Sequence, residues 1–346
     1  MLGTMTRRKD EDEGKNIPTV LDADEVIDKA FRKASKVRIE DPEPFYAFRK
    51  TLVAKLDSVS DTIGATLDRY ISAFPSFNNL SPFHHELYGV LFEITMAQRS
   101  LAALLWAKGQ VAAIARKNAS QMAKSKSRDF LDMKLGEAYG RINSVIQQVG
   151  KNLVFLAGVR EEIKKVPCVS MDVPTVIVAG APNVGKSLLV RKISTGKPEV
   201  APYPFTTKAI SVGHFDYKKI RFQVLDTPGL LDRPLSKRNK IELQAIMALR
   251  HLAGAIIFIM DPTEECGTEL GVQNKLLEEI ERDFIQGKGS KVFIAYNKTD
   301  LKERWKGDVP EGSFPISAET GDGVEPLKEA AAKYLFKKII SSGRLF

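Results

Sequence analysis

The stretch Gly180-Ala-Pro-Asn-Val-Gly-Lys-Ser187 decides the fold of the second half of this chain. It fits the phosphate-loop template G-x-x-x-x-G-K-[ST] and follows the apolar run 173–179, which predicts a buried strand. Glycines at the two template positions let the backbone bend into a nest of N–H groups, and a helix beginning near Lys186 adds the positive end of its dipole. The stretch therefore predicts an α/β domain with a mostly parallel sheet and helices on both faces.

The side chains of this loop indicate how it would hold a phosphate chain. Lys186 can reach the β and γ phosphates, and the Ser187 hydroxyl is a hard oxygen ligand suited to Mg²⁺. Kinases and ATPases share the template, so it leaves the base open. The residues expected to contact the phosphates are Asn183, Val184, Gly185, Lys186, Ser187 and Leu188.

A second motif, Asp226-Thr-Pro-Gly229, follows the apolar run 220–225, which places Asp226 at the carboxyl edge of the sheet. Asp226 can hold a magnesium-bound water. The Gly229 N–H can bond a γ-phosphate oxygen that GTP has and GDP lacks. Residues 226 to about 240 are therefore a candidate switch.

The motif Asn297-Lys-Thr-Asp300 indicates which base is bound, and it follows a third expected strand, 291–296. The Asp300 carboxylate can accept from guanine N1–H and the exocyclic amine, whereas adenine has no hydrogen at N1. A site with such an acceptor rejects the wrong analogue by roughly 10⁴-fold. The sequence therefore predicts a guanine nucleotide.

Other residues would complete the base site. Asn297 would support guanine O6 and N7 or the loop itself, and the Lys298 stem would cover the ring face. In the fourth motif, Ser317-Ala318, the Ala318 N–H would donate to O6.

Two adjacent threonines lie in the loop Pro202-Tyr-Pro-Phe-Thr-Thr-Lys208. One of them should complete the Mg²⁺ shell when the γ phosphate is present. The chemistry of the side chains does not choose between Thr206 and Thr207, and either residue could merely begin the next strand.

The chain resembles the Obg-related translation-factor GTPases and, more narrowly, the nucleolar GTP-binding protein 1 family. Several segments carry the narrower resemblance: Phe74 to His84, Val200 to Lys208, Val212 to Lys218, Gln223 to Asp232, Ile241 to His251 and Met260 to Gly267. The resemblance implies Thr207 as the magnesium ligand. It also implies a helical amino-terminal domain that contacts ribosomal RNA, and a GTPase domain that switches during assembly of the large ribosomal subunit.

The position after Asp-x-x-Gly, where many GTPases carry a glutamine that positions water, holds Leu230 here. Hydrolysis would then depend on Lys186, Thr207, Gly229, Mg²⁺ or a group from an activating factor, and slow intrinsic turnover is expected. Asn183 is similar to the asparagine with which related GTPases coordinate K⁺, although an asparagine also suits a tight turn.

Prolines are absent between Pro82 and Pro167, in a stretch rich in Ala, Leu and Lys. We therefore expect a charged, disordered tail over 1–16, an all-α helical bundle for docking over 17–168, and the P-loop GTPase domain over 169–346. Apolar stripes at helix spacing predict the seams of the bundle. They consist of Leu52, Leu56, Val59, Ile63 and Tyr70, and of Ile142, Val145, Val149, Leu153, Leu156 and Ile163.

The formal net charge of +9 permits a polyanionic partner. Residues 94–128 contain no Asp or Glu, so their basic side chains form either a solvated face or, as the resemblance favours, an RNA-binding face with a flexible turn at 120–127. The basic residues are Arg99, Lys108, Arg116, Lys117, Lys124, Lys126 and Arg128.

Two cysteines and four scattered histidines form no metal-ligand pattern, and no apolar run is long enough to cross a bilayer. We expect a cytoplasmic protein whose partners are the large-subunit precursor and its rRNA. Two alternatives stay open: a GTP-gated RNA placeholder with negligible hydrolysis, and a tRNA-modification or stress-response GTPase.

Overall fold

The computed structural model describes residues 16–166, 173–201, 209–233, 238, 240–285 and 290–341. Its contacts divide the chain into two compact units. Among the described residues, one unit holds 16–80 together with 91–164, and the other holds 81–90 together with the described residues from 165 onward.

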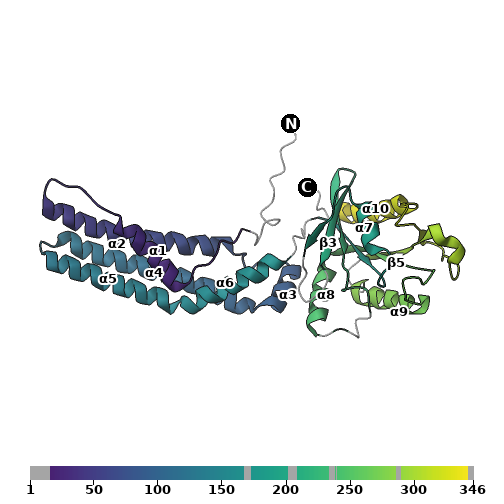
Figure 1. The fold of residues 1–346 in the computed structure, drawn as a ribbon, viewed down its shortest axis with the longest axis horizontal. Coiled ribbons are helices and arrows are strands. Elements are labelled where there is room, and N and C mark those ends of the chain that lie inside the picture. Colours follow the sequence, from purple (N-terminus) through teal and green to yellow (C-terminus); the bar gives the residue numbers. More distant parts are fainter. Residues whose placement is uncertain are drawn as a thin grey trace. The chain divides into compact units, whose positions relative to one another are not determined.

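The first unit is all α-helical, as the sequence predicts (Figure 1). An Asp22–Glu25 capping box begins α1, and Pro44 occupies the first turn of α2, where its missing N–H costs nothing. Only three residues join α4 to α5, so these two helices run antiparallel. The helices are α1 (Ala23–Ser35), α2 (Pro44–Ala73), α4 (Ile94–Lys124), α5 (Arg128–Gln148) and α6 (Gly150–Lys165).

Both predicted apolar stripes are buried, so they do form the seams of this unit. The first stripe lies on α2, where Tyr70 also accepts a hydrogen bond from the Leu21 N–H at 3.0 Å. The second stripe crosses a break, because Val149 leaves helical geometry between α5 and α6. The turn expected at 120–127 is shorter than predicted, since α4 continues to Lys124.

The short helix α3 (Pro82–Leu91) groups with the second unit, although it lies between two helices of the first unit in sequence. Phe83, Leu87 and Tyr88 are buried, and Glu86 Oε1 lies 2.8 Å from His251 Nε2. The expected domain boundaries, 17–168 and 169–346, leave α3 in the first domain, whereas the contacts group it with the second unit. Those boundaries follow chain order, whereas α3 is grouped by contacts with residues far away in sequence, such as His251.

Among the described helices, none alone is long and apolar enough to cross a membrane. The pair α3 and α4 passes that test when taken together, but it is bent by 90° at its junction.

The second unit is built on one seven-stranded sheet in the order β2-β3-β4-β1-β5-β6-β7. Strand β1 pairs in parallel with β4 and β5, and β6 continues the parallel part, while β2–β3 and β3–β4 are antiparallel. The strands are β1 (Thr175–Ala179), β2 (Glu199–Ala201), β3 (Ile210–Tyr217), β4 (Ile220–Asp226), β5 (Ala253–Met260), β6 (Lys291–Tyr296) and β7 (Phe314–Pro315).

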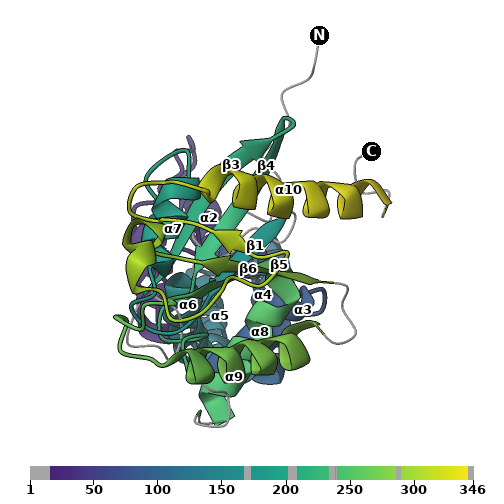
Figure 2. The same cartoon turned by 90° about the vertical axis from the view of Figure 1, so that its right-hand side faces the viewer.

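Helices cover both faces of this sheet, α7 and α10 on one side and α8 and α9 on the other (Figure 2). The expected α/β architecture is therefore confirmed. The bounds are α7 (Lys186–Ile193), α8 (Lys240–Leu252), α9 (Leu270–Ile280) with a π-helical turn at Glu281–Ile285, a 3₁₀ helix at Thr299–Arg304, and α10 (Val324–Ser341).

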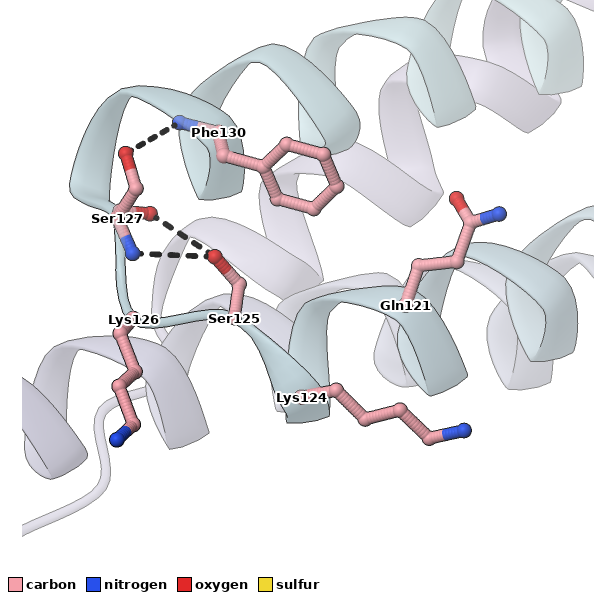
Figure 3. A pocket seen from close by; sticks show the side chains of 6 residues that line it. All are labelled: Gln121, Lys124, Ser125, Lys126, Ser127 and Phe130. Carbon is pink, nitrogen blue, oxygen red and sulfur yellow. Dashed lines mark hydrogen bonds between the residues drawn. The ribbon is translucent and has the colours of Figure 1, made fainter.

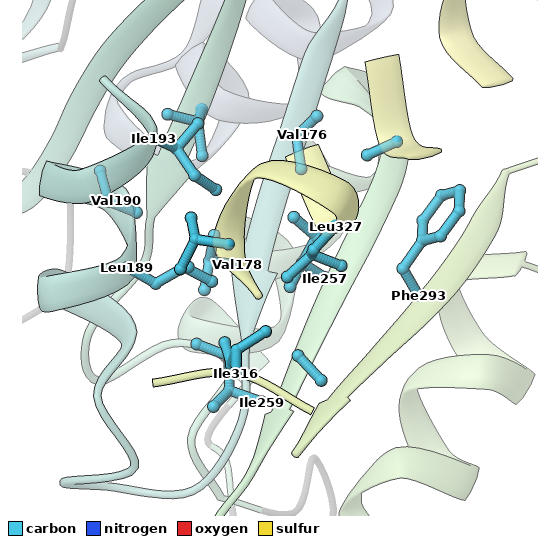
Figure 4. Close-up of a cluster of buried hydrophobic side chains, with 14 of the residues drawn as sticks. Val176, Val178, Leu189, Val190, Ile193, Ile257, Ile259, Phe293, Ile316 and Leu327 are labelled. Carbon is cyan, nitrogen blue, oxygen red and sulfur yellow. The ribbon is translucent and has the colours of Figure 1, made fainter. Parts of the chain in front are cut away.

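Strand β1 lies at the centre of the core, and all five of its residues are buried. Val176 and Val178 of this strand pack in one apolar cluster with Leu189 of α7, Ile257 of β5 and Leu327 of α10 (Figure 4). Because β1, β4, β5 and β6 are parallel, their carboxyl ends meet at one edge of the sheet. That edge carries every motif that the sequence singles out near a strand end.

Candidate nucleotide-binding site

The phosphate loop connects β1 to α7, and glycine is required at both of its template positions. Gly180 has φ +139°, and a Cβ there would lie 2.4 Å from the Ile259 carbonyl oxygen. Gly185 has φ +101°, and a Cβ there would lie 2.3 Å from Asn297 Nδ2. The loop is thus packed against β5 on one side and against the base-site motif on the other.

Lys186 is the first residue of α7 and is buried. Its ammonium group donates to the carbonyl oxygens of Gly180, at 2.9 Å, and Ala181, at 2.6 Å. The amine therefore lies inside the curve of the loop, the position expected for a group that meets phosphate oxygens. Val184 is buried, while Asn183 and Leu188 are exposed.

Ser187 and Asp226 are joined directly, because the Ser187 hydroxyl donates to Asp226 Oδ2. The other carboxylate oxygen, Oδ1, is buried and has no hydrogen-bond partner among the described residues. Burial raises the pKa of Asp226, and the Ser187 hydrogen bond and the charge of Lys186 oppose that rise only in part.

This pair of residues fits a magnesium ion. A buried oxygen without a partner is costly to a protein unless something else satisfies it. A hydroxyl beside a carboxylate is the hard oxygen set that Mg²⁺ prefers. In the described part of the chain no group of three or more His, Cys, Asp and Glu side chains could hold a metal.

The Asp-x-x-Gly segment makes its hydrogen bonds with residues that directly follow it in the chain. The Gly229 N–H, expected to meet a γ-phosphate oxygen, donates to Asp232 Oδ2 at 2.9 Å. Arg238 donates to the carbonyl oxygens of Gly229, at 2.5 Å, and Leu230, at 2.8 Å, and to Asp232 Oδ1 at 3.0 Å. A γ phosphate at Gly229 would therefore have to displace a carboxylate of the same loop.

Leu230 is 1% exposed, so its side chain belongs to the core and faces no attacking water. Thr206 and Thr207 lie outside the described residues, as do 234–237 and 239 of the expected switch.

The base-site motif begins with a residue that supports the loops. Asn297 Nδ2 donates to the Val184 carbonyl oxygen at 2.7 Å, and its Oδ1 accepts from the Ala318 N–H at 2.8 Å. Of the two roles open to Asn297, the structure shows the structural one. The Ala318 N–H, which is expected to donate to guanine O6, is the donor of this second hydrogen bond.

Asp300 is exposed at the start of the 3₁₀ helix, and the Ser317 hydroxyl donates to its Oδ1 at 2.6 Å. Ser317 in turn accepts from the Thr320 N–H at 3.1 Å. The hydroxyl of the fourth motif therefore orients the carboxylate that would read the base.

Sequence reasoning assigns no part in this site to Asp261, Asp232 or Arg238. Asp261 Oδ2 lies 2.7 Å from Lys298 Nζ. The sequence does carry a signal for Asp261, because it directly follows the apolar strand β5, as the other motifs follow their strands. Asp232 and Arg238 lie within the predicted switch, but their mutual contacts depend on a loop conformation that no motif encodes.

On the helical unit, the carboxyl end of α4 and the turn to α5 form an exposed basic surface that includes Arg116, Lys117, Lys124 and Lys126. A pocket of about 550 Å³ opens beside the turn, and Lys124 and Lys126 contribute two positive charges to its lining (Figure 3). The turn is ordered by hydrogen bonds, since Ser125 Oγ accepts from the Ser127 N–H and Ser127 Oγ from the Phe130 N–H. The pocket is lined by Gln121, Lys124, Ser125, Lys126, Ser127 and Phe130.

Comparison with known families matches both parts of the chain. Residues 15–170 match the family described as NOG1 N-terminal helical domain, and residues 175–298 match the family described as 50S ribosome-binding GTPase.

Individual relatives match across most of the chain. An uncharacterized protein of Methanocaldococcus jannaschii is 37% identical over 291 residues, which cover 83% of this chain and 81% of that protein. Nucleolar GTP-binding protein 1 of Saccharomyces cerevisiae is 33% identical over 314 residues, which cover 90% of this chain and 48% of the yeast protein. The protein of that name from Encephalitozoon cuniculi is 33% identical, with 93% of this chain and 63% of that protein covered. This chain thus spans about half the length of the yeast relative.

Proposed function

Since this chain belongs to the nucleolar GTP-binding protein 1 family, we propose that it binds GTP and hydrolyses it to GDP and phosphate as a switch in the assembly of the large ribosomal subunit. The observation that carries the proposal is the meeting of four motifs at one sheet edge. The phosphate loop and the base-site motif contact each other directly through Asn297 and Val184. A pocket for a guanine nucleotide needs both halves in that relation.

The proposed chemistry assigns a task to each side chain. The Lys186 ammonium, which donates to the Gly180 and Ala181 carbonyl oxygens here, would donate to phosphate oxygens instead when the nucleotide is bound. Ser187 and Asp226 would hold Mg²⁺, with Thr207 added as the resemblance implies. When bound, Mg²⁺ neutralises charge that develops on the β and γ phosphate oxygens.

The same geometry supports slow intrinsic turnover. With Leu230 buried, no side chain directly after Gly229 can orient water by hydrogen bonding. An activating partner, such as the large-subunit precursor, would then supply the missing group. Leu230 equally favours the second candidate, a GTP-gated placeholder that hardly hydrolyses. Turnover measured with and without large subunits separates the two, because a placeholder stays slow in both.

The helical unit would contact rRNA through its basic surface. Reversing the charge of Arg116, Lys117, Lys124 and Lys126 should weaken binding to large subunits by roughly 100-fold at moderate salt. It should also lower the slope of log K against log salt by about three to four, since each lost phosphate contact removes about one counterion. Filter binding across a salt series measures both quantities.

A matched control reverses four exposed basic residues at the carboxyl end of α1 and just after it, which gives the control variant the same net charge as the test variant. If both variants bind equally well, the basic surface is merely solvated. Copurification of tRNA or another protein in place of large-subunit RNA would favour the stress-response or tRNA-modification alternative. The control positions are Arg32, Lys33, Lys36 and Arg38.

A potassium role for Asn183 can be separated from a turn role by backbone geometry. Asn183 has φ +60°, a left-handed conformation that glycine adopts without strain. If its amide coordinates K⁺, both Asn183→Ala and Asn183→Gly should remove a roughly tenfold stimulation of turnover by K⁺ over Na⁺. If the residue serves only the turn, the glycine variant keeps wild-type turnover. Equal wild-type rates in the two salts would refute the potassium role.

A further inference from the structure

Asp261 and Lys298 are brought together by strand register. Strands β5 and β6 are parallel, with Met260 opposite Tyr296, so the residues that follow them emerge side by side. The Asn297 N–H donates to the Met260 carbonyl oxygen at 2.9 Å, which extends the pairing past the last strand residue. Lys298 Nζ then lies 2.7 Å from Asp261 Oδ2.

The carboxylate that meets this lysine is buried and rigidly held. The Asp261 side chain is 0% exposed. Its Oδ1 accepts from the Thr263 N–H, at 2.9 Å, and the Thr263 hydroxyl, at 2.6 Å, and its Oδ2 accepts from the Cys266 N–H at 2.8 Å. Gln273 braces the backbone of Asp261, accepting from its N–H at 2.8 Å and donating to its carbonyl oxygen at 3.1 Å.

Asp261 stays ionised despite its burial. Burial alone would raise the pKa of Asp261, but the hydrogen bonds from Lys298, Thr263 and Cys266 outweigh that effect and hold the pKa below its usual value. A buried anion with several donors is a fixed point in the structure, so the lysine that pairs with it is fixed as well.

Lys298 is also anchored at its backbone. It has φ +68°, and its carbonyl oxygen accepts from Trp305 Nε1 at 2.9 Å. The side chain is 20% exposed, so the methylene stem lies between two fixed ends and is only partly covered. A lysine in solution, by contrast, samples many rotamers along that stem.

We propose that Asp261 is a positioning residue of the guanine site, which holds the Lys298 stem as a preformed apolar cover for one face of the base. This inference rests on the proposed guanine-nucleotide function and adds a residue to it. Preorganisation matters because immobilising a lysine side chain on binding would weaken the affinity by roughly tenfold. The carboxylate removes that loss before the nucleotide arrives.

A double-mutant cycle tests the proposal on the 346-residue chain, with binding of a fluorescent GDP as the measurement. Lys298→Met keeps an apolar stem but removes the ammonium that Asp261 holds, and it should weaken GDP binding by roughly tenfold. Asp261→Asn should weaken it by a similar factor, and the double variant should be no weaker than either single variant. Because the pair would act on the base rather than the phosphates, KM for GTP should rise while kcat at saturation stays unchanged.

The neighbouring Glu264→Gln is the matched control. Glu264 is in the same loop, but one of its carboxylate oxygens pairs with Lys306 and the other accepts from the Leu270 N–H at 2.8 Å. This variant should bind GDP like the wild type.

The outcomes separate the inference from the proposed function. Should Asp261→Asn fail to fold, Lys298→Met still decides, because it leaves the hydrogen bonds of Asp261 to Thr263 and Cys266 in place. Wild-type affinity in Lys298→Met, or fully additive losses in the double variant, overturns the positioning role while leaving guanine binding intact. A wild-type chain that binds no guanine nucleotide overturns both.

Discussion

Asp300→Asn is expected to change the base preference of the site, weakening GDP and GTP binding by roughly 10³-fold or more while admitting xanthosine nucleotides. Guanine presents two donors, N1–H and the C2 amine, to the carboxylate, and an amide can accept from only one of them. Xanthine carries a carbonyl oxygen at C2, which suits the amide N–H₂ of asparagine. Competition of GDP, XDP and ADP against a fluorescent guanine nucleotide measures the change.

Orientation by Ser317 sharpens this test. Its hydroxyl donates to Asp300 Oδ1 at 2.6 Å. In Asp300→Asn the amide oxygen can accept that same hydrogen bond, which leaves the amide N–H₂ group directed toward the base. Asp308→Asn serves as the control, since this exposed carboxylate lies nearby in sequence and outside the motif. If ADP displaced the bound guanine nucleotide from the wild-type protein as readily as GDP does, the assignment of the base would be wrong.

The sequence predicted the parts of this fold that depend on local patterns. Strands β1, β4 and β6 are apolar runs followed by a motif, and such runs are typical of parallel strands covered on both faces. All of β1, the last five residues of β4 and half of β6 are buried. The glycines of the phosphate loop were likewise predictable, because only glycine suits positions 180 and 185. Local chemistry therefore located the candidate site and the order of its elements.

Contacts between distant segments could not be predicted in this way. The grouping of α3 with the second unit depends on partners such as His251, 165 residues away from Glu86. The bond from the Ala318 N–H to Asn297 competes with a proposed ligand contact, and only the folded loop decides between them. Asp261 shows the same limit, since its role depends on strand register rather than on its own sequence neighbours.

Replacing Asp226 tests the proposed metal centre, and Asp226→Asn is expected to lower GTP turnover by roughly 100-fold or more at saturating nucleotide. The carboxylate would supply the negative charge that retains Mg²⁺ beside Ser187, and an amide carries none. Single-turnover hydrolysis across a Mg²⁺ titration measures the loss. Chelating Mg²⁺ from the wild-type protein should reproduce it.

Lower turnover could also result from a less stable fold, and the stability of the protein without nucleotide separates the two causes. Asp226 Oδ1 is buried without a partner in the described structure, and burial raises the pKa of this carboxyl group, so its charge disfavours the folded state. Asp226→Asn should therefore unfold at the same urea concentration as the wild type or a higher one. Asp216→Asn, an equal change on the neighbouring strand β3, should leave both turnover and stability unchanged. If Asp226→Asn kept its turnover and its Mg²⁺ dependence, the metal would have to be held elsewhere. If it unfolded more easily, the buried carboxylate would be a structural group rather than a ligand.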